Sequence, residues 1–328
     1  MDILWSDPDD KVKDDWGPND RGVSVTFSQK ILEKFLENKK LEVDKDLKYF
    51  NIIYNAYSRL YQKHLFSKEG EEALKYLNNR GINNEEIKNR GIGFGFYGDV
   101  FETNLAKVIR EEIENSLTKD EIDDYQKWRE KFEAYNPELY LGLLSENKTS
   151  RYDSMSNRIT IPIRDKDNKI VAYGGRLFKE SSSLSKYSLT KTSAMWQKSN
   201  NVFGYVDAKY NLTNSNSLLI VEGFMDAMAL NKIGVPAVAL MGVNCSSKQA
   251  ELISALNAEK IYVALDFDFA GQINNEKVRD ALVKEGLDNV SIYIKSEWID
   301  TKDFDEYINQ DYKHFDFDIK KEIIEKSI

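Results

Sequence analysis

The second half of the chain alternates between short, fully apolar runs and longer amphipathic stretches. The apolar runs are rich in β-branched residues and predict strands at residues 218–221, 237–240, 261–265 and 290–294. Helical spacing between them predicts helices at 225–232, from Ser246 or Ser247 to about 256, and at 270–284. Apolar strands joined by crossover helices are typical of a parallel sheet covered on both faces. The pattern therefore predicts a small α/β domain at about 215–305.

Upstream of this domain the pattern predicts helices and then a β-hairpin. Helical spacing or helix-prone sequence occupies residues 28–47, 54–66, 68–80 and 101–132. The alternating, β-branched segments 158–164 and 170–173 flank a polar turn and predict an antiparallel pair. The fold class is therefore α/β, a parallel-sheet domain preceded by a mixed α+β basic subdomain with N-terminal helices. We expect four parts: an acidic extension and helix at 1–48, the α+β subdomain at 49–212, the parallel-sheet domain at 213–308 and a short helical tail at 309–328.

The composition limits the chemistry that is open to this chain. Its 328 residues include one cysteine, Cys245, which excludes an internal disulfide and a Cys-rich zinc site, and two histidines, which disfavour a His-based metal site. No apolar run approaches the ~18 residues that span a bilayer. We therefore expect a cytoplasmic protein.

The net charge of −9 argues, taken alone, against a nucleic-acid partner, but the charge is unevenly distributed. Between Arg151 and Lys198 there are ten basic and four acidic residues, an excess of six positive charges. This basic segment suits a surface that binds phosphate groups, and a solvated charged surface is the alternative. Within it, Gly174 and Gly175 precede Arg176, which suits either a close approach of the backbone to a ligand or a bulge.

Pairs of acidic residues follow three apolar, β-prone segments. They are Glu222 and Asp226, Asp266 and Asp268, and Asp303 and Asp305. Because parallel strands end at one edge of their sheet, we expect these carboxylates to gather there. Crowded like charges repel, and Mg²⁺ is a hard cation that binds carboxylate oxygens and keeps waters for phosphate. The sequence predicts a metal-dependent enzyme of phosphodiester chemistry, and for the last pair the alternative is a stabilising acidic helix N-terminus.

Three motifs around these carboxylates resemble the Toprim domain of DnaG-type primases. Residues 222–226 (Glu-Gly-Phe-Met-Asp) resemble the family's Glu-Gly-Tyr-Met-Asp, and residues 266–271 (Asp-Phe-Asp-Phe-Ala-Gly) resemble Asp-Gly-Asp-x-Ala-Gly. Residues 302–306 (Lys-Asp-Phe-Asp-Glu) resemble Lys-Asp-Pro-Asp-Glu. Upstream, the family's order and spacing are kept by Gly174-Gly175-Arg176, Lys186-Tyr187, Lys198 and Phe203-Gly204-Tyr205. In all, about residues 50–307 are similar to the RNA polymerase domain of a DnaG-type primase.

The resemblance implies DNA-templated RNA primer synthesis from NTPs on single-stranded DNA. It implies that catalysis depends on Glu222, Asp266 and Asp268. These residues would hold Mg²⁺, for which Mn²⁺ could substitute, together with Asp226, Asp303 and Asp305, and no zinc is expected. The template or the incoming nucleotide would be bound by Arg158, Arg176, Lys186 and Lys198.

The resemblance also suggests partners and a setting. The RNA primer would be bound as it grows. A replicative helicase or a separate start-site-recognition protein is expected as a further partner, because the family's zinc-binding and helicase-binding domains have no match in these residues. The expected setting is the cytoplasm of a bacterium or of a phage-infected host, without a membrane partner.

Departures from the family motifs and two rival functions remain open at this point. Phe267 replaces a glycine between two aspartates, where the backbone cannot take glycine-only angles, and Phe224 replaces a tyrosine. Residues 188–197 match only loosely. A Toprim-type metal-dependent nuclease would share the same carboxylates, and a non-catalytic replication accessory would bind single-stranded DNA without them. A topoisomerase is disfavoured because no second domain is seen to carry a DNA-attacking tyrosine.

Overall fold

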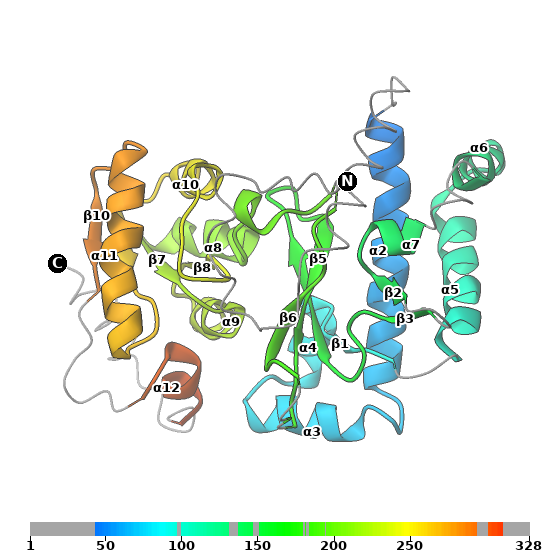
Figure 1. Ribbon diagram of the computed structural model, residues 1–328, viewed down its shortest axis with the longest axis horizontal. Coiled ribbons are helices and arrows are strands. Elements are labelled where there is room, and N and C mark those ends of the chain that lie inside the picture. The colour runs from blue at the N-terminus through cyan, green and yellow to red at the C-terminus, as the bar shows by residue number, and fades with distance from the viewer. Residues whose placement is uncertain are drawn as a thin grey trace, which may run out of the picture. The chain divides into compact units, whose positions relative to one another are not determined.

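The computed structural model describes residues 43–96, 100–130, 137–146, 151–179, 181, 184–193, 195–293 and 301–310 (Figure 1). The chain forms two compact units, one of Met1–Ile163 and Ile170–Trp196, the other of Arg164–Lys169 and Gln197–Ile328. The acidic extension, the predicted helix from residue 28 to residue 42, and the tail from residue 311 lie outside the described residues. The four-part division at residues 48, 212 and 308 stays a prediction.

The first unit is built around one long helix, α2 (Val43–Leu65). Tyr54, Tyr57 and Tyr61 recur at helical spacing and are fully buried, so this face of α2 forms the centre of the core. The sequence suggested two helices with a break at 47–54, and the structure shows one, because Tyr49 and Phe50 continue the buried face through that interval. The other helices of this unit are α3 (Glu71–Asn79), α4 (Asn84–Arg90), α5 (Val100–Ser116), α6 (Lys119–Glu130) and α7 (Pro137–Tyr140).

The predicted hairpin is the centre of a four-stranded sheet in the order β1-β4-β5-β6. Its strands are β1 (Gly93–Phe94), β4 (Ile159–Arg164), β5 (Ile170–Arg176) and β6 (Tyr187–Leu189), and a separate pair joins β2 (Leu144–Glu146) to β3 (Arg151–Asp153). Gly174 and Gly175 pair in regular register with β6, so no bulge interrupts β5. A Cβ at Gly175 would lie 2.6 Å from Met155 Sδ, and close packing of side chains therefore explains the glycine.

The second unit contains the predicted parallel sheet, in the order β10-β9-β7-β8. All its pairings are parallel, between β7 (Ser217–Val221), β8 (Ala237–Ala239), β9 (Lys260–Val263) and β10 (Val290–Ile292). The helices of this unit are α8 (Tyr205–Asn211), α9 (Phe224–Lys232), α10 (Ser247–Ser254), α11 (Phe269–Lys284) and α12 (Phe304–Gln310), with short 3₁₀ turns η1 (Lys198–Asn200) and η2 (Leu212–Asn214). The α/β prediction for this region is confirmed.

Helices cover this sheet, and three of its strands, β7, β8 and β9, are largely buried. Every residue of β7 is buried, and its side chains join those of β8, β9 and α10 in one apolar core. In Figure 1 the long helix α11 runs beside β10. Among the described helices, none combines the length and the apolar character needed to cross a membrane.

Candidate active site

The predicted acidic residues begin at the carboxyl edge of the parallel sheet. In the register of the strands, Ile220 of β7 lies opposite Val263 of β9, so Glu222 and Asp266 both follow at the same edge. Gly223 then starts α9, and Asp268 starts α11. The sheet topology thus brings the first two motifs together, as the sequence predicted.

Asp226 lies in the first turn of α9 and is 7% exposed. Its Oδ1 accepts a hydrogen bond from the backbone N–H of Asp305 at 3.0 Å, which joins the first motif to the third. A Cβ at Gly223 would lie 2.8 Å from Asp226 Oδ2, so the glycine of this motif leaves room for the carboxylate. Burial, and then repulsion from Asp303 among other acidic neighbours, raises the pKa of Asp226 well above its usual range.

The segment from Asp266 to Gly271 is a strand-to-helix turn. Asp268 Oδ1 accepts from the backbone N–H of Gly271 at 2.9 Å and caps α11. A Cβ at Gly271 would lie 1.9 Å from the backbone oxygen of Asp266, so only glycine allows the helix to start this close to the turn. The buried Asn275 stabilises the start of the turn, because its side-chain oxygen accepts a hydrogen bond from Leu265 N at 2.9 Å.

The third acidic segment begins α12 and also caps it. Glu306 N donates to Asp303 Oδ1 at 2.7 Å, and Lys302 N donates to Glu306 Oε2 at 3.1 Å. Asp305 is 5% exposed, and its side chain accepts from Asn309 Nδ2 at 2.7 Å. These residues therefore do form an acidic helix N-terminus. They also lie near the other carboxylates, so the two interpretations of this segment are compatible.

One lysine lies against the acidic cluster. Lys302 Nζ is 3.4 Å from Asp266 Oδ2, and their side chains are 60% and 22% exposed. Burial raises the pKa of Asp266, Lys302 opposes that rise, and Asp303 and Asp268 add to it. An ion pair this exposed is weak, and it engages one carboxylate of the cluster. Lys302 therefore reduces the repulsion around Asp266 without replacing a cation that several carboxylates would share.

The donor chemistry of the cluster fits a hard divalent cation, because its side chains offer carboxylate oxygens. Within the described ranges, however, no three His, Cys, Asp or Glu side chains are arranged to hold a metal ion. Asp226, Asp266, Asp268 and Asp303 each have a protein partner in this conformation. The carboxylates are close enough to shift one another's pKa, but they do not form a finished coordination shell.

The two predicted arginines are buried in the first unit. Arg158 is 7% exposed and donates to Ser185 O at 2.9 Å. Arg176 is 2% exposed, donates to the hydroxyl of Tyr76 at 2.7 Å and lies 4.8 Å from the ring centre of Tyr187. Their guanidinium groups thus support the segment that carries β6. Contact with a template or a nucleotide stays a prediction for both.

The two predicted lysines differ in their surroundings. Lys186 is exposed at the edge of β6 in the first unit, and Lys198 is half-buried in η1 of the second. The buried side chain of Gln249 donates to the backbone oxygens of Lys198, at 3.3 Å, and of Leu240, at 3.2 Å. Leu240 follows β8, so the backbone of Lys198 lies at the same carboxyl edge as the acidic residues.

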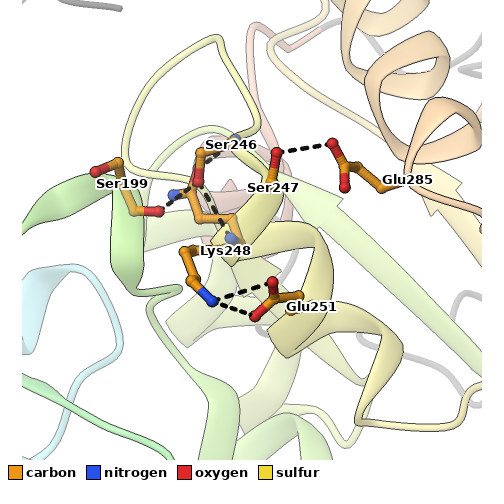
Figure 2. Close-up of polar contacts among 7 residues, drawn as sticks. Ser199, Ser246, Ser247, Lys248, Glu251 and Glu285 are labelled. Atoms are coloured by element: carbon orange, nitrogen blue, oxygen red, sulfur yellow. Dashed lines mark hydrogen bonds and ion pairs between the residues drawn. The ribbon is translucent and has the colours of Figure 1, made fainter. Parts of the chain in front are cut away.

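Figure 2 shows the start of α10, where the Ser246 side chain donates to Ser199 O and Ser247 donates to Glu285 Oε1 at 2.7 Å. Ser246 and Gln249 form a capping box, so Ser246 rather than Ser247 is the N-cap. The role of Gln249 in holding η1 was not predicted from the sequence. Its only signal there is the spacing of a glutamine three residues after a serine, which is the pattern of this cap.

Comparison with known proteins agrees with the motifs and the fold. Residues 60–209 match the family model of the DNA primase catalytic core, N-terminal domain, and residues 219–308 match a Toprim-like model. A DNA primase of Halalkalibacterium halodurans is 31% identical over 243 residues, and one of Staphylococcus aureus is 30% identical over 245. The chain belongs to the DnaG-type primase family.

Coverage of these DnaG-type relatives is partial. The two matches span 73% and 74% of this chain but 36% of each relative, so the chain corresponds to about a third of their length. Among solved structures, a DnaG primase catalytic domain bound to single-stranded DNA has a TM-score of 0.65 at 21% identity and covers 87% of this chain and 80% of that one. The RNA polymerase domain of the Mycobacterium tuberculosis primase DnaG has a TM-score of 0.64 at 20% identity, with coverage of 84% and 82%. Both likenesses confirm the fold.

Proposed function

We propose that this chain synthesises RNA primers on a single-stranded DNA template by metal-dependent nucleotidyl transfer from NTPs. The observation that carries the proposal is the convergence of three acidic segments at the carboxyl edge of a parallel sheet, where Asp303 and Asp266 both raise the pKa of Asp226. The names of the related proteins, DNA primases, support it. Such a chain would act in the cytoplasm of a bacterium or a phage-infected host.

In this proposal the oxygen of the primer's 3′-hydroxyl bonds to the α-phosphorus of an NTP, pyrophosphate leaves, and the hydroxyl proton passes to solvent. Bound divalent ions would supply the neutralising charge and the alignment that this step needs. We assign their binding to Glu222, Asp266 and Asp268, joined by Asp226, Asp303 and Asp305. The oxygen donors favour Mg²⁺, with Mn²⁺ as a substitute.

The basic residues are proposed to bind the template and the nucleotide. Lys198 lies at the carboxyl edge with the carboxylates and is our candidate for contact with the triphosphate. Lys186 is exposed and is the candidate for contact with template phosphates. Arg158 and Arg176 would act there by holding the segment of Lys186 in place, since both donate within the first unit. A replicative helicase or a start-site-recognition protein is proposed as a further partner.

Labelled NTPs, single-stranded DNA and Mg²⁺ or Mn²⁺ provide the test. Substitution of Glu222→Gln or Asp266→Asn should abolish primers, because each removes a charge from the proposed metal ligands. Glu251→Gln is the matched control, since Glu251 is 62% exposed and pairs with Lys248 on α10 (Figure 2). Undiminished primer synthesis by both the Glu222→Gln and the Asp266→Asn variant would refute the proposal.

The same experiment separates the two rival functions. A Toprim-type nuclease would shorten labelled DNA in Mn²⁺, whereas a primase leaves its length unchanged. A non-catalytic accessory would bind single-stranded DNA with a steep salt dependence and would be indifferent to metal and to Asp266.

A further inference from the structure

The second and third acidic segments are joined by contacts that do not involve their carboxylates. The backbone N–H of Phe267 donates to Lys302 O at 2.8 Å. The rings of Phe267 and Phe304 meet edge to face, with centres 4.8 Å apart and planes at 70°. Each phenylalanine stands, in the sequence, between two of the proposed metal ligands. The contact therefore joins the Asp266–Asp268 turn to the Asp303–Asp305 segment.

A third ring attaches the pair to the sheet. Tyr293 lies 5.5 Å from Phe304 and 6.4 Å from Phe267 between ring centres. Its backbone N–H donates to Val263 O at 2.9 Å, at the end of the strand that leads to Asp266. Phe304 is 2% exposed and Tyr293 is 8% exposed, whereas Phe267 is half-buried, so two of the three rings are enclosed by protein.

Both members of the contact are departures from the motifs of the family. Phe267 stands where the family has glycine, and Phe304 stands where it has proline. Among the described residues, the non-glycine positions with positive φ are Asn157, Asn168, Met241 and Asn257, so the backbone at Phe267 needs no glycine. Proline stiffens a segment through its fixed φ, and a buried ring stiffens it through packing. The two departures therefore form one local arrangement.

The acidic residues around this ring contact explain why the two segments need an additional contact. The backbone contacts between Asp305 and Asp226 and between Phe267 and Lys302 bring the three acidic motifs close together, and like charges at close range favour separation of the segments when no cation lies between them. The polar link from Lys302 to Asp266 is exposed, and a divalent cation would compete with it. Phe304 is buried and Phe267 is half-buried, and the contact between their rings involves no charge, so salt does not screen it and a bound cation does not compete for it.

We propose that Phe267 is a positioning residue, which together with Phe304 keeps the Asp303–Asp305 segment against the Asp266–Asp268 turn, so that both segments contribute carboxylates to divalent-ion binding. The proposal rests on the proposed function for the identity of the metal ligands.

Mn²⁺ binding measured directly by calorimetry, and by the rise in melting temperature on Mn²⁺ addition, tests the proposal without an activity assay. Phe267→Gly and Phe304→Pro should each raise the half-saturating Mn²⁺ concentration between about two- and ten-fold, the loss expected for one aromatic pair. The double variant, which restores the family's residues, should bind no more weakly than either single variant. Phe267→Tyr keeps the ring and should bind as the parent does.

Phe269→Ala is the matched control, because Phe269 is an aromatic residue of the same turn that is 78% exposed. It should leave Mn²⁺ binding unchanged. Should Phe267→Gly fail to fold, Phe267→Leu, which keeps apolar volume without the ring, should still weaken binding about two-fold or more. Parent-like binding in the single variants would overturn the proposal, and so would additive losses in the double variant.

Failure of the positioning role can be distinguished from failure of the proposed function. A parent chain that makes primers while Phe267→Gly binds Mn²⁺ normally would overturn the positioning role alone. A parent chain that binds Mn²⁺ through Asp266 but makes no primers would overturn primer synthesis and leave the positioning role supported.

Discussion

Asp268 has two roles that a pair of substitutions separates. Its Oδ1 accepts from Gly271 N at 2.9 Å and begins α11, a helix of 16 residues. Its charge also raises the pKa of Asp266, so Asp268 contributes to the repulsion in the cluster. Relief of repulsion predicts that both Asp268→Ala and Asp268→Asn stabilise the metal-free protein, whereas the cap predicts a loss for alanine alone.

The difference between the two variants isolates the cap. Removal of an N-cap acceptor costs about 1 kcal/mol, and asparagine caps a helix about as well as aspartate does. The lost charge costs ~0.3–1 kcal/mol at the helix N-terminus in both variants and therefore cancels in the comparison. We expect the free energy of unfolding of Asp268→Ala to be about 1 kcal/mol lower than that of Asp268→Asn, and its melting temperature to be about 1–2 °C lower.

Thermal unfolding in the presence of EDTA measures this difference, and primer synthesis measured in parallel reports on the site. Both variants should make no primers, because each lacks the second carboxylate of the turn. Asp280→Asn is a control on the same helix, since its side chain is 68% exposed and pairs with Arg279. Equal melting temperatures for the two Asp268 variants would refute the capping role, and primers from Asp268→Asn would refute the role in metal binding.

Three further predictions concern the supports of the site and the core of the first unit. Gly271→Ala places a Cβ 1.9 Å from Asp266 O, so it should lower the free energy of unfolding by about 1–3 kcal/mol and weaken Mn²⁺ binding, both measurable by thermal melts. Gln249→Leu leaves buried backbone oxygens without their donor and should cost about 1–3 kcal/mol in denaturant unfolding, unlike Glu251→Gln. Burial raises the pKa of Asp153 to about 6 despite three hydrogen-bond donors. The folded protein thus holds a proton that the unfolded chain has lost, and stability should fall by about 3 kcal/mol as the pH rises from about 4 to about 6, a slope that Asp153→Asn lacks in denaturant titrations.

The parallel sheet was predictable because three of its strands, β7, β8 and β9, are largely buried. A strand in that position must be apolar throughout, as residues 218–221 are, and few other structures produce such short continuous runs between helical stretches. The place of the first two acidic motifs followed from the same reasoning, since parallel strands end together. The helix α2 was divided wrongly in the prediction, because Tyr49 and Phe50 signal a helix only through partners distant in sequence, such as Trp128.

The surroundings of the basic residues were beyond the reach of the sequence. An arginine in a basic segment usually indicates an exposed surface. Nothing in the neighbouring sequence indicates that the guanidinium group of Arg176 lies against the rings of Tyr76 and Tyr187. The contact between Phe267 and Phe304 has the same character, because it joins residues that are far apart along the chain. Local patterns predict elements and their order, whereas these contacts depend on how the elements pack.

The caps on α11 and α12 restrict which acidic residue can occupy the starts of these helices. Asp268 and Asp303 each offer one oxygen to a backbone amide, and a second oxygen is left over on the same carboxyl group. The capping hydrogen bond thereby fixes the orientation of the second oxygen, because the single methylene of aspartate holds the carboxyl group close to the start of the helix. Glutamate would keep the charge, but its longer side chain would extend past the amide. An Asp→Glu exchange, usually regarded as mild, would therefore remove the cap and change the orientation of the second oxygen together. Selection on the cap is thus inseparable from selection on the oxygen's orientation.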